Sequence, residues 1–129
     1  MAEQTRQAPV LVVEDDGLIR MDLADILADM GLSTVEAANA DQALKVMDTL
    51  PAISALMTDI DMPGSMNGIA LAHRTALRSP TCPLLIISGR YNPADGTLPD
   101  GAVFLSKPIS ESALRRALVE MGLIGAVDW

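Results

Sequence analysis

Short, almost unbroken apolar stretches recur along the chain and are separated by longer, more mixed segments. Four of the stretches predict strands, over residues 10–13, 55–57, 84–87 and 102–105, and a more polar stretch over 32–37 predicts an edge strand. Continuous apolar runs are typical of parallel strands that are covered on both faces. The pattern therefore predicts a parallel sheet buried between two layers.

The segments between the strands predict four helices, over residues 18–30, 41–50, 68–77 and 110–121. Gly31 and Pro51 end the first two, and Asn39 and Ser110 are expected N-caps of the second and the fourth. Strands that alternate with helices in this way indicate an α/β, doubly wound fold with right-handed crossovers.

One connection departs from the alternation. The segment over 89–101 contains Pro93, Gly96, Pro99 and Gly101, which disfavour a helix. We expect a loop with at most one short helical turn, so that the fourth helix of the regular pattern is short or replaced.

Composition narrows the classes of protein. The chain has 129 residues, which fits one domain, and half of them are apolar although almost none is aromatic. A net charge of −8 argues against nucleic-acid binding, which relies on clustered Lys and Arg. The sequence contains neither a membrane-length apolar run nor a signal-peptide pattern, so we expect a cytoplasmic protein without membrane contact.

Polar residues that could take part in chemistry follow the predicted strands. They are Glu14, Asp15 and Asp16 after the first, Asp59 and Asp61 after the third, Ser88 after the fourth and Lys107 after the fifth. Because the carboxyl ends of parallel strands lie on one edge of the sheet, where such folds bind ligands, these residues are expected to converge.

Each of these residues also has a structural explanation on its own. Asp15 or Asp16 can cap the first helix, and Asp16 is expected to do only that. Asp59 and Asp61 can be turn residues before Pro63. Independent caps and turns would not, however, all select the groups that one reaction needs.

Electrostatics suggest which reaction. Carboxylates crowded within about 4 Å repel by up to about 4 kcal/mol per pair at an effective dielectric constant near 20, so the site needs a cation. Oxygen ligands without His or Cys favour Mg²⁺, with Mn²⁺ as the alternative. A metal ion and Lys107 beside one carboxylate suit phosphoryl transfer, with Asp59 as the nucleophile and an acyl phosphate as the product.

Four motifs in this order resemble the response-regulator receiver family of two-component signalling. They cover residues 11–15 (LVVED), 58–64 (TDIDMPG), 87–89 (ISG) and 106–108 (SKP), and so span nearly the whole chain. The resemblance implies a flavodoxin-like, five-stranded sheet with strand order 2-1-3-4-5. It also implies a receiver domain over 9–123, with tails over 1–8 and 124–129.

The resemblance assigns roles to individual residues. Glu14 and Asp15 would hold the metal, with Asp59 as both ligand and phospho-acceptor and the carbonyl of Asp61 as a further ligand. Ser88 and Lys107 would bind phosphoryl oxygens, and the Lys107–Pro108 bond would be cis. Ser88 and Phe104 would be the switch residues, with Phe104 at the aromatic switch position, and Asp61 and Arg90 occupy positions that tune hydrolysis. The alternatives are that Phe104 is a plain core residue and that Asp61 and Arg90 are plain surface charges.

The family also implies partners. The phosphoryl group would come from a histidine kinase or a histidine phosphotransfer protein. Because the chain ends at Trp129, we expect no DNA-binding or catalytic output module; output would be a downstream protein target or a phosphate-sink role, and a homodimer remains open. The apolar tail over residues 123–129 would pack back on the domain or serve an interface. The protein would not be a turnover enzyme.

Two other functions compete with this interpretation. Asp59-Ile60-Asp61 resembles the Asp-x-Asp motif of haloacid-dehalogenase-like phosphatases, although that motif follows the first strand of its fold and leaves Glu14 and Asp15 unexplained. The third interpretation is a degenerate receiver that acts only as an interaction module. Multiple turnover would favour the phosphatase, and an absence of Mg²⁺ binding would favour the interaction module.

Overall fold

A computed structural model describes residues 8–91, 94 and 96–125, which contain a five-stranded parallel sheet. The strands are β2 (Val10–Val13), β3 (Thr34–Ala37), β4 (Ala55–Asp59), β5 (Leu84–Ser88) and β6 (Val103–Ser106). Their spatial order is β3-β2-β4-β5-β6, and each neighbouring pair is parallel. Counted along the chain this is the order 2-1-3-4-5, so the predicted fold class is confirmed.

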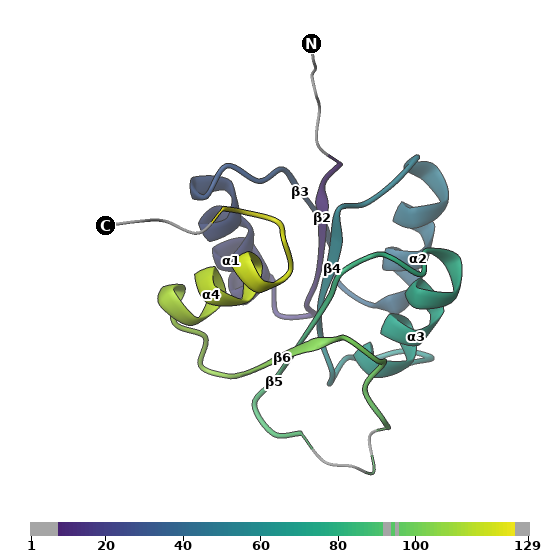
Figure 1. Cartoon of the computed structure of the whole chain (residues 1–129). Helices are drawn as coiled ribbons and strands as arrows, with labels where there is room; N and C mark the ends of the chain where they lie inside the picture. Colours follow the sequence, from purple (N-terminus) through teal and green to yellow (C-terminus); the bar gives the residue numbers. More distant parts are fainter. Residues whose placement is uncertain (1–7, 92–93, 95, 126–129) are drawn as a thin grey trace.

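Two helices cover each face of the sheet (Figure 1). The helices are α1 (Gly17–Asp29), α2 (Ala40–Thr49), α3 (Gly68–Arg78) and α4 (Glu111–Glu120). Alternate residues of β2 point to opposite layers: Val10 and Val12 pack with α1 and α4, whereas Leu11 and Val13 pack with α2 and α3. All four residues of β2 are at most 1% exposed, which is why this strand is continuously apolar.

The helix starts follow the capping residues in the sequence. Asn39 and Ser110 accept hydrogen bonds from Gln42 N and Ala113 N, as predicted. Asp16 caps α1 by accepting from Leu18 N and Ile19 N. Asn67, which the sequence did not single out, caps α3.

The predicted edge strand is two residues too long at its start. β3 begins at Thr34 because Leu32 belongs to the end of α1: its N–H donates to Leu27 O over 3.0 Å, and its side chain is buried. Gly31 makes this turn with a φ of +89°. The apolar character of Leu32 therefore comes from the helix side of the core and not from the strand.

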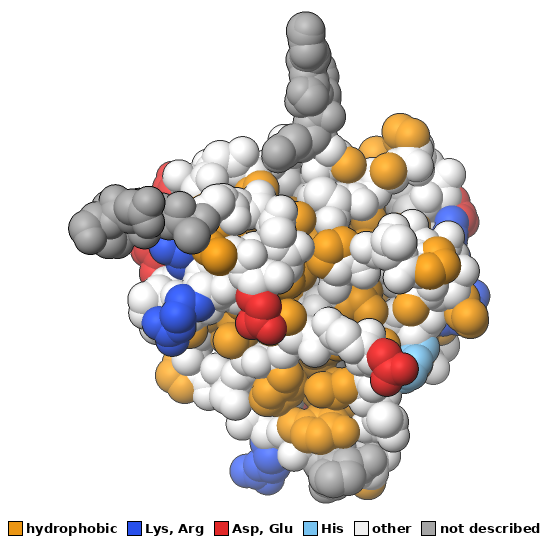
Figure 2. Space-filling view, in the orientation of Figure 1, with side chains coloured by type: hydrophobic (Ala, Val, Ile, Leu, Met, Phe, Trp, Pro, Cys, Tyr) orange, Lys and Arg blue, Asp and Glu red, His pale blue; other side chains and the backbone are white. Residues whose placement is uncertain are grey.

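The connection between β5 and β6 is a loop over its described residues, as predicted, with one short helical turn at Ala94. The Tyr91 hydroxyl donates to Gly96 O over 2.7 Å, and His73 Nε2 on α3 lies 2.6 Å from Thr97 O. Hydrophobic side chains remain visible over β6 on this face (Figure 2). The loop thus lies against α3 where a covering helix would stand in the regular alternation.

Both predicted tails lie largely outside the part of the chain that the structure describes. Leu123 and Ile124 pack against the core beside α4, while residues 1–7 and 126–129, which hold most of both predicted tails, lie outside the described residues. The predicted domain bounds remain a prediction.

No helix within the described residues combines the length and the apolar character that a bilayer crossing needs.

Candidate functional site

The carboxyl ends of β2 and β4 bring three carboxylates together. Asp59 is the last residue of β4, and Glu14 and Asp15 directly follow β2. Each offers a carboxylate oxygen, and these oxygens lie within 4.8 Å of one another. Glu14 is 3% exposed and Asp59 is 6% exposed, whereas Asp15 is exposed to solvent. The predicted acidic cluster is therefore present, with two of its members buried.

Lys107 links the two buried carboxylates. Its Nζ lies 3.0 Å from Glu14 Oε1 and 3.0 Å from Asp59 Oδ2. Its backbone N–H donates to Ser88 O, and this hydrogen bond extends the pairing of β5 and β6 by one residue beyond the end of β6. Burial by itself would lower the pKa of Lys107, but the hydrogen bonds to Asp59 and Glu14 outweigh it and raise the pKa. Lys107 is thus held as a fixed positive charge at neutral pH.

The pKa of Glu14 is raised above its ordinary value of 4.5. Burial is the main cause, and the charge of Asp59 adds to it; hydrogen bonds from Asp16 N and Lys107 act in the opposite direction. Ionised Glu14 is therefore not fully compensated by its neighbours. A further cation at this position would favour the charged form.

The donor set fits a hard divalent cation. Glu14, Asp15 and Asp59 contribute carboxylate oxygens within 4.8 Å of one another, and Lys107 is the one cation paired with them within the described residues. Mg²⁺ prefers oxygen ligands of this kind and keeps several waters, and Mn²⁺ accepts the same set.

Ser88 and Asp61 flank this cluster. Ser88 ends β5, next to the end of β4, and its buried Oγ accepts a hydrogen bond from Arg90 N over 3.1 Å. Asp61 is exposed and lines a cavity of about 450 Å³ together with Asp15. Arg90 is also exposed, and no ion pair joins it to Asp61 within the described part of the chain. The predicted roles of these three residues remain predictions.

A comparison of the sequence with models of known protein families agrees with the fold and with the residues at the strand ends. The family model described as "Response regulator receiver domain" matches residues 10–119. The chain belongs to the response regulator receiver family. It is accordingly a receiver domain of two-component signalling, from a family of signalling modules and not of turnover enzymes.

Individual relatives agree with this assignment. The receiver is 37% identical over 109 residues to a putative NtrX-like response regulator of Rickettsia bellii, an alignment that covers 81% of this chain and 23% of the relative. It therefore spans about a quarter of the length of the NtrX-like relatives it matches.

Solved receivers have the same fold. A response regulator receiver protein of Sinorhizobium medicae superposes with a TM-score of 0.81 at 23% identity, over 90% of this chain and 94% of that one. The receiver domain of the hybrid histidine kinase CckA superposes with a TM-score of 0.74 at 29% identity, over 88% and 98% of the two chains.

The receiver has a cis Lys107–Pro108 bond, as the family resemblance implied. Phe104, at the predicted switch position on β6, is half-buried, and its ring contacts the Tyr91 ring in a tilted arrangement, with an interplanar angle of 57° and a centroid distance of 5.7 Å. Phe104 is therefore neither a fully buried core residue nor free on the surface, and its switch role remains a prediction.

Sequence reasoning missed two residues of the receiver that adjoin the site. Tyr91 contacts both Phe104 and Gly96, and Arg20 donates to the backbone carbonyl of Glu14. The only signal for Tyr91 was its type, because the chain has a single tyrosine. Arg20 gave no signal, since a basic residue on a helix is usually a solvated charge.

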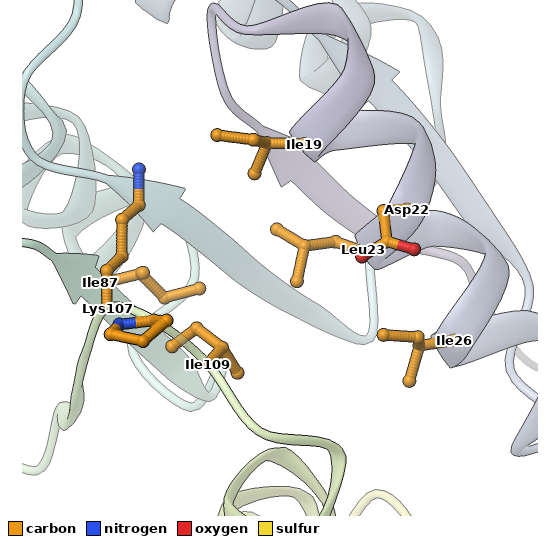
Figure 3. A pocket seen from close by; sticks show the side chains of 8 residues that line it. Ile19, Asp22, Leu23, Ile26, Ile87, Lys107 and Ile109 are labelled. Carbon is orange, nitrogen blue, oxygen red and sulfur yellow. The ribbon is translucent and has the colours of Figure 1, made fainter.

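An apolar groove of about 430 Å³ runs from Lys107 along α1. Figure 3 shows Ile19, Leu23 and Ile26 of α1 facing Ile109 and the stem of Lys107 across it. The residues that line it are Ile19, Asp22, Leu23, Ile26, Ile87, Lys107, Pro108 and Ile109. On α1 itself, Leu18, Ile19 and Met21 are 76%, 40% and 50% exposed. The receiver thus presents unpartnered apolar surface beside its acidic site.

Proposed function

We propose that this receiver accepts a phosphoryl group on Asp59 with the help of Mg²⁺ and passes the signal on through protein contacts. The observation that carries the proposal is the position of Asp59: it lies 3.0 Å from Lys107 Nζ and within 4.8 Å of the oxygens of Glu14 and Asp15. A carboxylate flanked by a fixed cation and by a site for a second one is suited to attack on phosphorus.

In this proposal an oxygen of Asp59 attacks the phosphorus of a phosphohistidine. The P–O bond forms while the P–N bond breaks, and the imidazole leaves with the electron pair and takes up a proton. Lys107 pairs with one phosphoryl oxygen, and Ser88 turns from Arg90 N to donate to another. Bound Mg²⁺, held by Glu14, Asp15 and Asp59, supplies charge neutralisation. Water later hydrolyses the acyl phosphate.

The rival functions account for less of the geometry. A phosphatase built on Asp59 and Asp61 would not need a buried Glu14 in contact with Lys107. A degenerate receiver would not need a buried hydroxyl at Ser88 beside the acceptor. The phospho-acceptor function uses all of these groups, and a cytoplasmic location is part of the same proposal.

The direct test is incubation with acetyl phosphate and Mg²⁺. We expect up to one acid-stable, alkali-labile phosphoryl group per chain, which does not form when EDTA removes the metal before the donor is added, because both the acceptor and its metal site are required. Intact-protein mass spectrometry measures the stoichiometry. Sustained release of phosphate from small phosphate esters would favour the phosphatase, and an unlabelled chain that binds no Mg²⁺ would favour the interaction module.

We further propose that a protein donor docks in the groove between α1 and Pro108. The groove reaches Lys107, so a helix that carries phosphohistidine and lays apolar side chains against Ile19 and Ile109 would bring its phosphorus near Asp59. A histidine kinase or a histidine phosphotransfer protein has this chemistry.

Ile19→Asp tests the docking proposal. A charge in the apolar groove should slow transfer from a histidine-phosphorylated partner protein by about 10-fold or more. Labelling by acetyl phosphate should stay within about twofold of wild type, because the small donor needs no groove. Leu77→Asp is the matched control, since Leu77 is 81% exposed on α3 and lies outside the groove. Equal losses in both variants, or none in Ile19→Asp, would contradict groove docking.

A further inference from the structure

Arg20 bridges the acidic site and the edge strand. It lies in the first turn of α1, where its N–H donates to Asp16 O. Its Nη1 donates to the backbone carbonyl of Glu14 over 2.7 Å, and its Nε donates to Glu36 Oε1 on β3 over 3.0 Å. The side chain is only 22% exposed, so the guanidinium is largely enclosed. A planar fork of this kind restrains geometry more than a flexible ammonium does.

Arg20 contacts Glu14, which belongs to the acidic cluster and pairs with Lys107. Glu14 is restrained at four points: its N–H donates to Ala37 O over 3.1 Å, its carbonyl accepts from Arg20, and its two carboxylate oxygens accept from Lys107 and from Asp16 N. A bound divalent ion would compete for the carboxylate bonds only. The two backbone bonds therefore remain to hold Glu14 in place when the ion is present.

We propose that Arg20 is a positioning residue that holds the turn over residues 14–16 in the geometry that binds the divalent ion. This inference rests on the proposed function. The carboxylates of Glu14, Asp15 and Asp59 repel one another across less than 4.8 Å, and the turn that carries two of them would relax outward without a restraint. A charge-assisted hydrogen bond to the carbonyl of Glu14, at the start of this turn, supplies that restraint.

A simpler role for Arg20 would be to tie α1 to β3 through Glu36. The two roles are separable because they use different nitrogens of the guanidinium. Glu36→Gln removes the carboxylate of the ion pair and leaves the bond to Glu14 O. Arg78→Gln is a second control, since it breaks a comparable Arg–carboxylate pair, 2.7 Å from Asp48, at the last residue of α3.

The experiment is a Mg²⁺ titration of wild type and variants in the absence of any phosphodonor, followed by backbone amide NMR. Arg20→Gln should raise the Mg²⁺ Kd by about 10-fold, as is usual when the residue that orients a metal ligand is lost. Glu36→Gln and Arg78→Gln should stay within about twofold of wild type. At saturating Mg²⁺, labelling of Arg20→Gln by acetyl phosphate should return to the wild-type rate. Guanidinium chloride unfolding of each metal-free variant measures stability separately.

The outcomes distinguish this inference from the function it rests on. If wild type binds Mg²⁺ and Arg20→Gln binds it equally well, or if Glu36→Gln weakens binding as much, the positioning role is wrong and the proposed function stands. A loss of stability without a change in Kd likewise overturns it. If wild type itself binds no Mg²⁺, both fail. Should Arg20→Gln not fold, Arg20→Lys carries the same test with an expected rise of about 3-fold, because Lys cannot form the fork.

Discussion

Replacing Asp59 by Asn should abolish phosphorylation of the receiver. Asn has the same size and its side-chain oxygen can still accept from Lys107, so the fold should be kept, but an amide oxygen is uncharged and a poor nucleophile. We expect labelling by acetyl phosphate and Mg²⁺ to fall by at least about 100-fold. Intact-protein mass spectrometry and circular dichroism measure the label and the fold of the same sample.

Asp61→Asn is the matched control. It makes the same chemical change two residues further on, at an exposed side chain that ends no strand. If the two variants lose labelling equally, the effect comes from the charge of the region and not from a nucleophile at Asp59. If Asp59→Asn is still labelled at the wild-type rate, the acceptor is a different residue and the proposed mechanism fails.

Gly68→Ala should be the most destabilising small substitution at the site. Gly68 is the first residue of α3 and packs directly on the acceptor strand: an added Cβ would lie 1.8 Å from Asp59 O and 2.9 Å from Thr58 Oγ1. The nearest atom is backbone and cannot swing away, so α3 or the end of β4 must move. We expect a loss of about 3 kcal/mol in the free energy of unfolding, measured in guanidinium chloride, together with slower phosphorylation of Asp59.

Gly17→Ala is the control, because Gly17 is the first residue of α1 and likewise has no positive φ. Its added Cβ would meet only the flexible end of Arg20, at 3.7 Å, an ordinary contact. There Ala should leave stability unchanged or raise it by up to about 1 kcal/mol. A Gly68→Ala protein as stable as Gly17→Ala would mean that α3 can retreat from Asp59 at little cost.

Much of the fold could be predicted because strands that are buried on both faces of the sheet appear in the sequence as continuous apolar runs. The runs of β2 and β5 are apolar at every residue before the strand end, and the first polar residues after β2, at Glu14 and Asp15, fall where the strand reaches the ligand-binding edge. The convergence of Asp59 and Lys107 follows from parallel topology alone.

The features that could not be predicted depend on backbone atoms or on unusual loops. The partner of Arg20 is a carbonyl oxygen, which every residue has, so no pattern points to it. The close approach of Gly68 likewise involves the carbonyl of Asp59. The tilted ring contact of Tyr91 with Phe104 depends on the path of a Pro- and Gly-rich loop, which residue spacing does not determine. Leu32 misled the strand assignment because its apolar side chain serves the end of α1.

The contact between Glu14 and Lys107 spans 93 residues of chain. During synthesis the acidic groups leave the ribosome first, and the strand that brings their counter-charge leaves much later. A nascent receiver therefore holds β4 before it holds the lysine that pairs with Asp59. The site that we propose as the phospho-acceptor is consequently complete only once β6 has joined the sheet.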